Sequence, residues 1–180
     1  MISWSQSGPK YYDRLAEEQF KEDRVADPVT TTLFIDADAC PVTRDALSIA
    51  RRKHVPVVLV SNPTQNLDRY TSRDGVEAIQ VSTGRDAADF AIVERLSDGD
   101  VVVTQDIGLA AMVLGRSAYA ISPRGRVFNK VTIDMEMAVR HAEQVHRRGG
   151  GRTKGPSVFD DDDKERFKDA LTRILEETLA

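Results

Sequence analysis

Apolar and polar residues follow one another along the chain in blocks that are typical of an α/β protein. Short runs of β-branched apolar residues predict strands that are buried on both faces of a sheet; these runs cover residues 31–35, 55–61, 76–81, 101–104 and 118–121. Apolar residues at helical spacing predict helices; the first begins at Pro41, and the others cover residues 86–96, 107–114, 134–148 and 161–179. This order predicts a three-layer α/β sandwich with a mostly parallel central sheet and right-handed crossovers.

The same pattern divides the chain into three parts. Residues 1–30 are polar and charged with irregularly spaced apolar positions, and we expect an N-terminal extension outside the core. Residues 31–148 contain all the predicted strands and form the expected α/β domain. Residues 149–180 contain a glycine-rich basic loop and an amphipathic helix that we expect to pack on the domain. We also expect the helix over residues 134–148 to face the core with its apolar side, which is formed by Met135, Ala138, Ala142 and Val145.

The composition fits a protein with one main core and no membrane span. Its 25 Lys and Arg against 29 Asp and Glu give a formal net charge of -4, which argues against a general polyanion binder. No apolar run approaches the roughly 20 residues of a spanning helix, and no secretion signal opens the chain, so we expect a cytoplasmic protein. Cys40 is the single cysteine, which excludes an intramolecular disulfide and a Cys-rich zinc site. It adjoins a predicted helix start, which can lower a thiol pKa; a small packed residue is the alternative.

Five aspartates are expected to meet at the carboxyl edge of the sheet. They are Asp36, Asp38, Asp86, Asp89 and Asp106. The first two follow the first strand one residue apart, so their side chains point the same way in extended backbone. The next two open the helix over residues 86–96, on the side that we expect to face inward; that side also carries Phe90, Val93 and Leu96. The last follows the strand over residues 101–104, whose carboxyl end lies at the same edge as that of the first strand.

Carboxylates crowded at one edge favour a divalent metal ion. Like charges that lie close together must be protonated, separated or neutralised by a cation. Ligands that are all oxygens, without an array of His or Cys, favour Mg²⁺ or Mn²⁺ over zinc. An ion held in this way can orient water for attack on phosphorus, as in phosphodiester hydrolysis. For Asp38 and Asp86, a helix cap or turn residue is the alternative.

Candidate substrate contacts lie beside the aspartates in the predicted fold. Asn62 and Thr104 end strands at the same edge of the sheet. The stretch 140–154 has a local excess of Lys and Arg, and its glycine-rich loop carries Arg152 and Lys154. Such a loop can bring backbone N–H groups and cations to phosphates. A solvated helix end explains the same charge without a ligand.

Four stretches of the chain resemble the YaiI/YqxD family of bacterial proteins. They are Asp36-Ala-Asp-Ala-Cys-Pro41, Gly84-Arg-Asp86-Ala-Ala-Asp89, Asp100-Val-Val-Val-Thr-Gln-Asp106-Ile-Gly-Leu-Ala-Ala111 and Gly150-Gly-Arg-Thr-Lys-Gly-Pro156. Residues 1–30 lie outside the resemblance, and the family brings no established activity. It is similar, more distantly, to PIN/NYN-type nucleases, which are Mg²⁺- or Mn²⁺-dependent ribonucleases with acids at the carboxyl edge of a parallel sheet. This likeness implies a PIN-like fold, RNA as the partner, and Asp36, Asp89 and Asp106 as the catalytic acids.

Two other functions stay open at this point. Asp36 and Asp38 also resemble the opening motif of haloacid-dehalogenase-type phosphatases, in which the first acid is the nucleophile and the second is the general acid. Ser61 suits the hydroxyl position of that family. Against this likeness, Ala39-Cys40 replaces the usual Gly-Thr, and no lysine follows at the third motif. A protein of the same fold that binds metal or RNA without cutting it is the non-enzymatic alternative.

Overall fold

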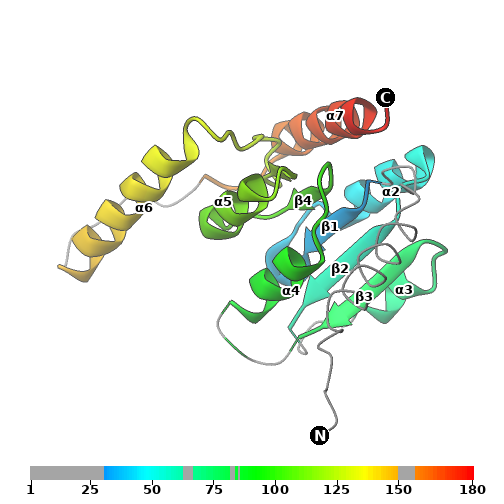
Figure 1. Cartoon of the computed structure of the whole chain (residues 1–180), viewed down its shortest axis with the longest axis horizontal. Coiled ribbons are helices and arrows are strands. Elements are labelled where there is room, and N and C mark those ends of the chain that lie inside the picture. The colour runs from blue at the N-terminus through cyan, green and yellow to red at the C-terminus, as the bar shows by residue number, and fades with distance from the viewer. Residues whose placement is uncertain (1–30, 63–66, 82–83, 85, 150–156) are drawn as a thin grey trace, which may run out of the picture. The chain divides into compact units, whose positions relative to one another are not determined.

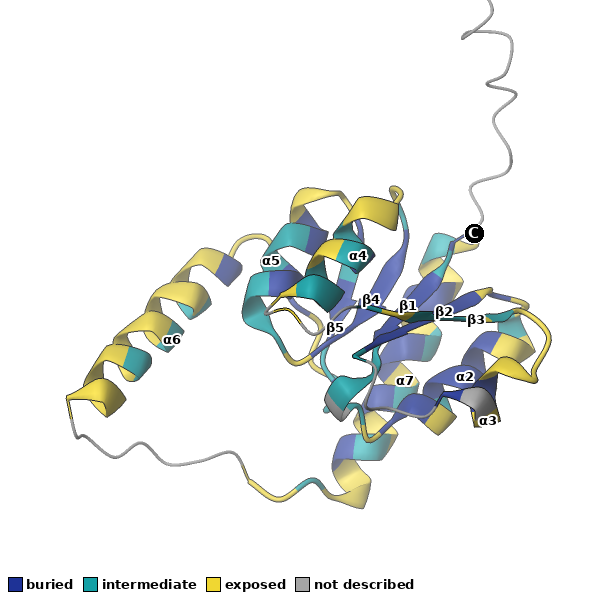
Figure 2. Ribbon diagram, turned by 90° about the horizontal axis from the view of Figure 1, so that it is seen from below, coloured by how far each residue is buried: buried dark blue, intermediate teal, exposed yellow. Residues whose placement is uncertain are grey.

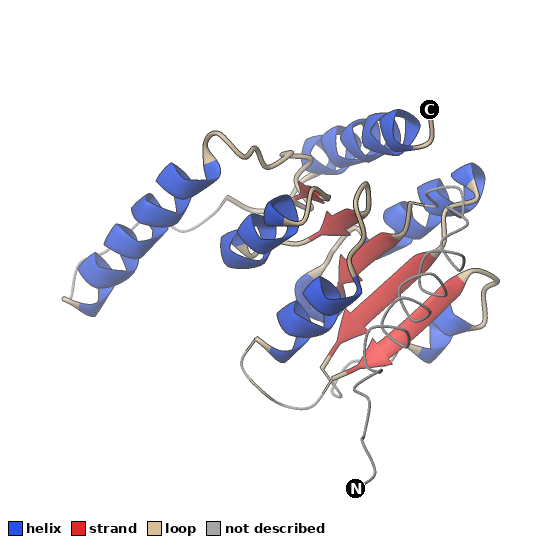
Figure 3. Ribbon diagram, in the orientation of Figure 1, coloured by secondary structure: helices blue, strands red, loops and turns tan. Residues whose placement is uncertain are grey.

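The centre of the fold is a sheet of five parallel strands (Figures 1 and 3). The computed structural model describes residues 31–62, 67–81, 84, 86–149 and 157–180. The strands are β1 (Leu33–Asp36), β2 (Val57–Ser61), β3 (Val76–Gln80), β4 (Val101–Val103) and β5 (Tyr119–Ile121). They lie in the order β3-β2-β1-β4-β5. The predicted α/β class with a parallel sheet is therefore confirmed, because each strand falls within its predicted segment or one residue beyond it.

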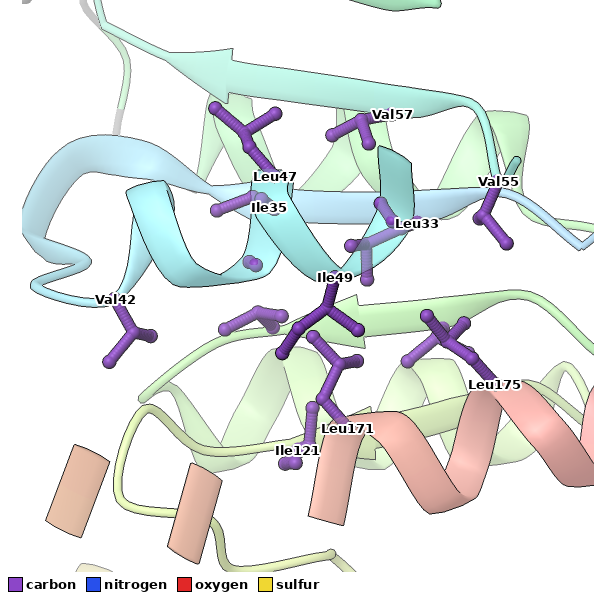
Figure 4. Packing of buried hydrophobic residues seen from close by; sticks show 14 of the residues in the cluster. Leu33, Ile35, Val42, Leu47, Ile49, Val55, Val57, Ile121, Leu171 and Leu175 are labelled. Carbon is purple, nitrogen blue, oxygen red and sulfur yellow. The ribbon is translucent and has the colours of Figure 1, made fainter. Parts of the chain in front are cut away.

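Helices cover both faces of this sheet and complete the three layers. One face carries α2 (Thr43–Lys53) and α7 (Asp161–Thr178), and the other carries α4 (Ala87–Arg95) and α5 (Ile107–Gly115). Figure 2 shows the sheet edge-on between the two helical layers. On the first face, Leu33 and Ile35 of β1 pack with residues of α2 and α7 (Figure 4). Successive residues of a strand point to opposite faces, so Phe34 enters the second cluster, with α4 and α5.

The strand order places a topological switch point between β1 and β4. From β1 the chain crosses through α2 to β2 and continues outward to β3. It then returns through α4 on the other face and enters β4 on the opposite side of β1. The register pairs Leu33 with Val101 and Ile35 with Val103, so the carboxyl ends of β1 and β4 lie level. In open α/β sheets, ligands bind in the crevice outside such a pair of strand ends.

Two connections contain short elements that the sequence does not predict. A short 3-10 turn, η1 (Ala37–Ala39), lies between β1 and α2. The segment 62–75, predicted as a loop, contains the short helix α3 (Asp68–Thr71). After β5, one isolated antiparallel bridge joins Ile121 and Val127. No helix in the described ranges has the length and apolar content that a membrane span requires.

The helix α6 (Ile133–Arg148) contradicts its predicted packing. Its expected inner residues are exposed; these are Met135, Ala138, Ala142 and Val145. Met135 is 72% exposed and Val145 is 54% exposed. The helix instead contacts the domain through its opposite, more polar side. On that side Glu136 pairs with Arg126 and Arg140 pairs with Asp106, and Ile133 at the start of the helix is buried. Its apolar side therefore faces away from the sheet, and α6 extends outward in Figure 1.

Candidate functional site

The carboxyl ends of β1 and β4 are joined by the side chain of Thr104. Its hydroxyl donates a hydrogen bond of 3.0 Å to Oδ2 of Asp36, and it accepts one of 3.0 Å from the backbone N–H of Asp106. Thr104 is buried, with 1% of its surface exposed, so this link is protected from water. The sequence proposed Thr104 as a substrate or supporting contact. The structure places it beneath the two acids, where it sets their relative positions.

Asp36 ends β1 and is only partly exposed. Burial is the main cause that raises the pKa of its carboxyl group. The hydrogen bond from Thr104 lowers that pKa, and the charges of Asp38 and Asp106 raise it again. The negative charges of Asp38 and Asp106 therefore contribute to the raised pKa of Asp36.

Asp106 has two kinds of partner. It is the N-cap residue of α5, and its Oδ1 accepts a 2.6 Å hydrogen bond from the backbone N–H of Gly108. Arg140 of α6 donates from Nη1 to the same oxygen at 3.1 Å and from Nη2 to Oδ2 at 3.4 Å. The ion pair is partly exposed, so solvent weakens it. Arg140 was noted in the sequence only as part of a basic stretch, and no local pattern predicts a contact across 34 residues.

Asp89 lies in the first turn of α4, and its carboxyl group has a strongly raised pKa. Burial, followed by the charges of Asp106, Asp36 and Asp86, raises its pKa from the usual 3.8 to about 6. These charges come from β1, from the start of α4 and from the residue that caps α5. These four aspartates therefore lie near one another at this edge of the sheet, and all of them line the same pocket.

Asp38 and Asp86 have different surroundings from the other three. Both carboxylate oxygens of Asp38 accept hydrogen bonds from Asn62, at 2.8 Å from its backbone N–H and 2.9 Å from its side chain. This contact connects η1 to the end of β2. Asp86 is exposed and precedes α4 with a left-handed φ of 63°, and its side chain makes no capping hydrogen bond. Asp86 thus occupies the N-cap position of α4 without making a capping hydrogen bond. Asp38, in contrast, has a structural role, because it accepts two hydrogen bonds from Asn62.

All five aspartates line one open pocket of about 420 Å³, together with Asn62. We call it the acid pocket. A second pocket of about 670 Å³ shares Asp38 with it and is lined by arginines and aromatic side chains. We call this the arginine pocket; the residues that define it here are Arg69, Tyr70, Arg124, Arg126, Phe128 and Phe159. The sequence analysis did not find it, because its residues come from separate parts of the chain.

Some sequence predictions about the surroundings are wrong or fall outside the described residues. Phe90 does not face inward but is 65% exposed, because Ile92 and Leu96 define the buried side of α4. Arg152 and Lys154 lie outside the described residues. Burial raises the pKa of the Cys40 thiol, and Cys40 packs against the core beside α2, which favours the packed alternative over a reactive thiolate.

The acid pocket fits a metal ion that keeps much of its water. Among the residues that the structure describes, no three His, Cys, Asp or Glu side chains are grouped closely enough to hold an ion by themselves. Mg²⁺ usually binds one or two carboxylates, several waters and a substrate phosphate rather than an all-protein cage. The carboxylates give the open pocket oxygen ligands only, and the pKa of Asp89 is raised by burial and by three neighbouring charges; this chemistry is compatible with that mode of binding.

Comparisons with known proteins identify similar chains but no solved structure. The family model described as "Uncharacterized BCR, YaiI/YqxD family" matches residues 34–177. A UPF0178 protein of Exiguobacterium sibiricum is 42% identical over 145 residues, which cover 81% of this chain and 96% of that protein. UPF0178 proteins of Caulobacter vibrioides and Xanthomonas campestris pv. campestris are 42% and 44% identical over 82% of this chain, covering 94% and 92% of their own lengths. No solved structure matches the chain.

Proposed function

The chain belongs to the YaiI/YqxD family of bacterial proteins, and we propose that it is a divalent-metal-dependent nuclease that hydrolyses RNA phosphodiesters at the acid pocket. One observation carries the proposal. Asp36, Asp89 and Asp106 come from separate parts of the chain and line one open pocket at the switch point of a parallel sheet, where burial and then the charges of Asp106 and Asp36 raise the pKa of Asp89. Mutual repulsion of this kind is relieved by a cation.

The proposed metal-binding acids are Asp36, Asp89 and Asp106, of which one or two would bind Mg²⁺ or Mn²⁺ directly and the rest through its bound waters. Asp86 is exposed at the mouth of the pocket and adds negative charge. Asp38 lies at the wall that both pockets share, where Asn62 already occupies its two oxygens. When bound, the ion supplies a water activated for attack and neutralises charge on the phosphate.

The residues around the acids have supporting roles in this proposal. Thr104 holds Asp36 and Asp106 at the ends of adjacent strands, and its hydroxyl favours the ionised form of Asp36. Arg140 presents a guanidinium group beside Asp106, where it suits a phosphate oxygen of the substrate. RNA is the proposed polymer, and the bacterial cytoplasm is the proposed location.

A cleavage assay tests the proposal directly. We expect single-stranded RNA to be cut in the presence of Mn²⁺ or Mg²⁺, and not in the presence of a chelator. Asp36→Asn and Asp106→Asn should each lower the rate by at least about a hundredfold, as expected for loss of electrostatic stabilisation. Glu94→Gln is the matched control, since Glu94 is an exposed acid of α4 that does not line the acid pocket. Equal background rates for the wild type and the two active-site variants would contradict the nuclease proposal.

The phosphatase alternative has less support. Ser61, its candidate hydroxyl, is fully buried, and its Oγ has no hydrogen-bond partner among the described residues. Asp38, its candidate general acid, holds Asn62 with both oxygens. Hydrolysis of a small phosphomonoester through a covalent adduct at Asp36 would favour the phosphatase. RNA binding without cleavage would favour the non-enzymatic alternative.

A further inference from the structure

We propose that the arginine pocket binds one nucleotide unit of single-stranded RNA next to the acid pocket. This inference rests on the proposed function, because it names the position of the substrate beside the cluster of acids. The two pockets share Asp38, so a strand lying across that wall would occupy both. The volume of about 670 Å³ lies within the range of small-ligand sites.

Three arginine–aromatic stacks surround this pocket. The guanidinium of Arg69 lies 4.7 Å from the ring centre of Tyr70. Arg126 lies 5.3 Å from the ring centre of Phe128, and Arg124 lies 5.7 Å from that of Phe159. All six side chains line the same pocket, but Tyr70 and Phe128 are buried, so the guanidinium planes that cover them are the surfaces left to face a ligand. Guanidinium planes and aromatic rings are the surfaces on which proteins stack the unpaired bases of RNA.

The charges of the three arginines are not used equally within the protein. Arg124 pairs with the buried Asp163 at the start of α7 and also donates to Ser157. Arg126 pairs with Glu136 of α6. Arg69 is exposed and has no ion pair among the described residues, while it lies over Tyr70. Arg69 is therefore the cation of the pocket that is best placed to meet a phosphate or a base.

The charge of Arg69 gives the pocket a substrate preference. Its charged lining consists of three arginines and Asp38, but Arg124 and Arg126 are already neutralised by Asp163 and Glu136. A polyanion alone would be repelled by the five aspartates of the neighbouring pocket, and a neutral apolar ligand would leave Arg69 without a partner charge. A nucleotide offers a flat base for the stacks and a phosphate for the boundary between the pockets, so it matches both features.

A binding assay tests this site. Fluorescence anisotropy measures the binding of a labelled single-stranded oligoribonucleotide, and a chelator in the buffer removes divalent ions and so prevents cleavage. We expect Arg69→Ala to raise the dissociation constant by about fivefold or more, the loss of roughly one base stack. Arg95→Ala is the control, because Arg95 is an exposed arginine of α4 that pairs with Glu77 outside both pockets. Equal losses in both variants would show a general charge effect and overturn the proposal. Unchanged binding by Arg69→Ala would overturn it as well.

Competition by a nucleoside monophosphate or by inorganic phosphate shows whether the pocket recognises a nucleotide or only an anion. A nucleoside monophosphate should displace the RNA through the arginine pocket in the wild type and less well in Arg69→Ala. Displacement by inorganic phosphate at the same concentration would reduce the pocket to an anion site and overturn the nucleotide assignment. If RNA binding depends on Arg69 but no RNA is cut, the nuclease proposal fails and the nucleotide site stands. If RNA is cut but its binding does not depend on Arg69, the nuclease proposal stands and the nucleotide site fails.

The exposed apolar side of α6 supports a second, independent inference. We infer that α6 pairs in antiparallel orientation with α6 of a second copy of this chain. Its apolar residues occur at spacings of three and four and form one stripe; they are Met135, Ala138, Val139, Ala142 and Val145. All of them are exposed, while the opposite side of the helix is held to the domain by Arg140 and Glu136. The stripe thus has no partner within the described part of the chain.

The pattern of α6 is self-complementary in the antiparallel orientation. With a twofold axis beside residue 140, Met135 of one copy lies opposite Val145 of the other, and Ala138 lies opposite Ala142. Small residues at the centre permit close approach of the two helices. Asp134 in the first turn and Arg148 in the last turn lie at the same margin of the stripe, so the acidic end of one helix meets the basic end of the other. A second copy of the chain therefore fits this surface in shape and in charge.

The size of the surface sets the expected strength. A helix of 16 residues is about 24 Å long, and one such stripe is smaller than the roughly 800 Å² per partner of a standard interface. We therefore expect a reversible dimer that forms as the protein concentration rises. Sedimentation equilibrium should show this dimer in the wild type. A monomer at all attainable concentrations would overturn the inference.

Two kinds of variant test the geometry. Ala142→Glu replaces an exposed residue of the stripe with a good helix former and should raise the dimer dissociation constant by about tenfold or more. Gln144→Glu, on the opposite side of the helix, adds the same charge and should have little effect. In a Cys40→Ser background, mixing Ala138→Cys with Ala142→Cys should give a crosslinked heterodimer on oxidation. Crosslinking within either variant alone would indicate parallel pairing, and a dimer that tolerates Ala142→Glu would place the interface elsewhere; either result overturns the inference.

Discussion

Replacement of Asp89 by Asn tests whether the acid pocket is under electrostatic strain in the metal-free protein. The change keeps the size of the side chain and removes its charge. Asp89 has a pKa of about 6 in the folded protein against the usual 3.8, so folding disfavours its ionised form. The native state consequently loses stability as the pH rises from about 4 through 6. Asp89→Asn should therefore raise the melting temperature of the metal-free protein at pH 7.5.

The magnitude follows from the same pKa. At about 1.4 kcal/mol for each unit, a rise from 3.8 to about 6 sets an upper limit of about 3 kcal/mol. Asp89 is only partly buried, so solvent screening reduces this value, and we expect about 1 kcal/mol. For a domain of this size that corresponds to a rise of about 2–4 °C in melting temperature. The gain should be smaller at pH 5, where the wild-type carboxyl is already largely protonated.

Thermal unfolding by calorimetry, in a chelator and then with Mg²⁺ or Mn²⁺, measures both parts of this prediction. At ten times its dissociation constant, a bound ion stabilises the native state by about 1.4 kcal/mol. The wild type should gain this stability, and Asp89→Asn should gain much less. Glu94→Gln, an exposed change on the same helix, should alter neither value appreciably. If Asp89→Asn is no more stable than the wild type at pH 7.5 in the chelator, the reasoning that burial and repulsion disfavour the ionised carboxylate is refuted.

Three further changes test the structure around the site. Thr104→Val removes the hydrogen bond to Asp36 from a buried position, and it should cost about 1–2 kcal/mol in urea unfolding and lower RNA cleavage; unchanged cleavage would contradict its positioning role. Gly125→Ala should destabilise by roughly 2 kcal/mol or more, because φ is +80° and an added Cβ would lie 2.5 Å from the backbone of α7. Gly115→Ala, with nothing within 4 Å, is its control and should be near neutral. Phe167→Ala should lower the free energy of unfolding by about 3–5 kcal/mol in a denaturant titration, because Phe167 is fully buried between α7 and the sheet. A much smaller loss would argue that α7 is not part of the core.

The fold could be predicted well because its strands have strong local patterns. Val101–Val103 and Val57–Ser61 are continuous runs buried on both faces, which leaves little ambiguity about their state. The carboxyl ends of parallel strands lie at one edge, so the positions of Asp36 and Asp106 followed from the strands themselves. The strand order, and with it the switch point between β1 and β4, requires long-range contacts that no local pattern encodes.

The errors have a common physical origin. A helical pattern shows which side of a helix is apolar, but not whether that side meets its own domain. In α6 the apolar side points outward, because the ion pairs of Glu136 and Arg140 hold the polar side to the domain. In α4 the buried side is set by Ile92, so Phe90 lies outside although it shares a spacing with other apolar residues. The arginine pocket escaped prediction for a related reason, since its stacks are assembled from three separate segments.

The surroundings of the aspartates separate structural acids from functional ones more sharply than their positions in the sequence do. Asp100 is buried, yet it accepts hydrogen bonds from the backbone of Thr32 at 2.8 Å and of Ser97 at 2.7 Å. Asp163 is buried as well, and Arg124 and Arg166 neutralise it. Asp89 has no ion pair among the described residues, and burial, followed by the charges of its acidic neighbours, raises its pKa. Its ionised form therefore lowers the stability of the free protein, and the proposed cation would offset both the repulsion and the loss of solvation, which is why Asp89 is among the proposed functional acids.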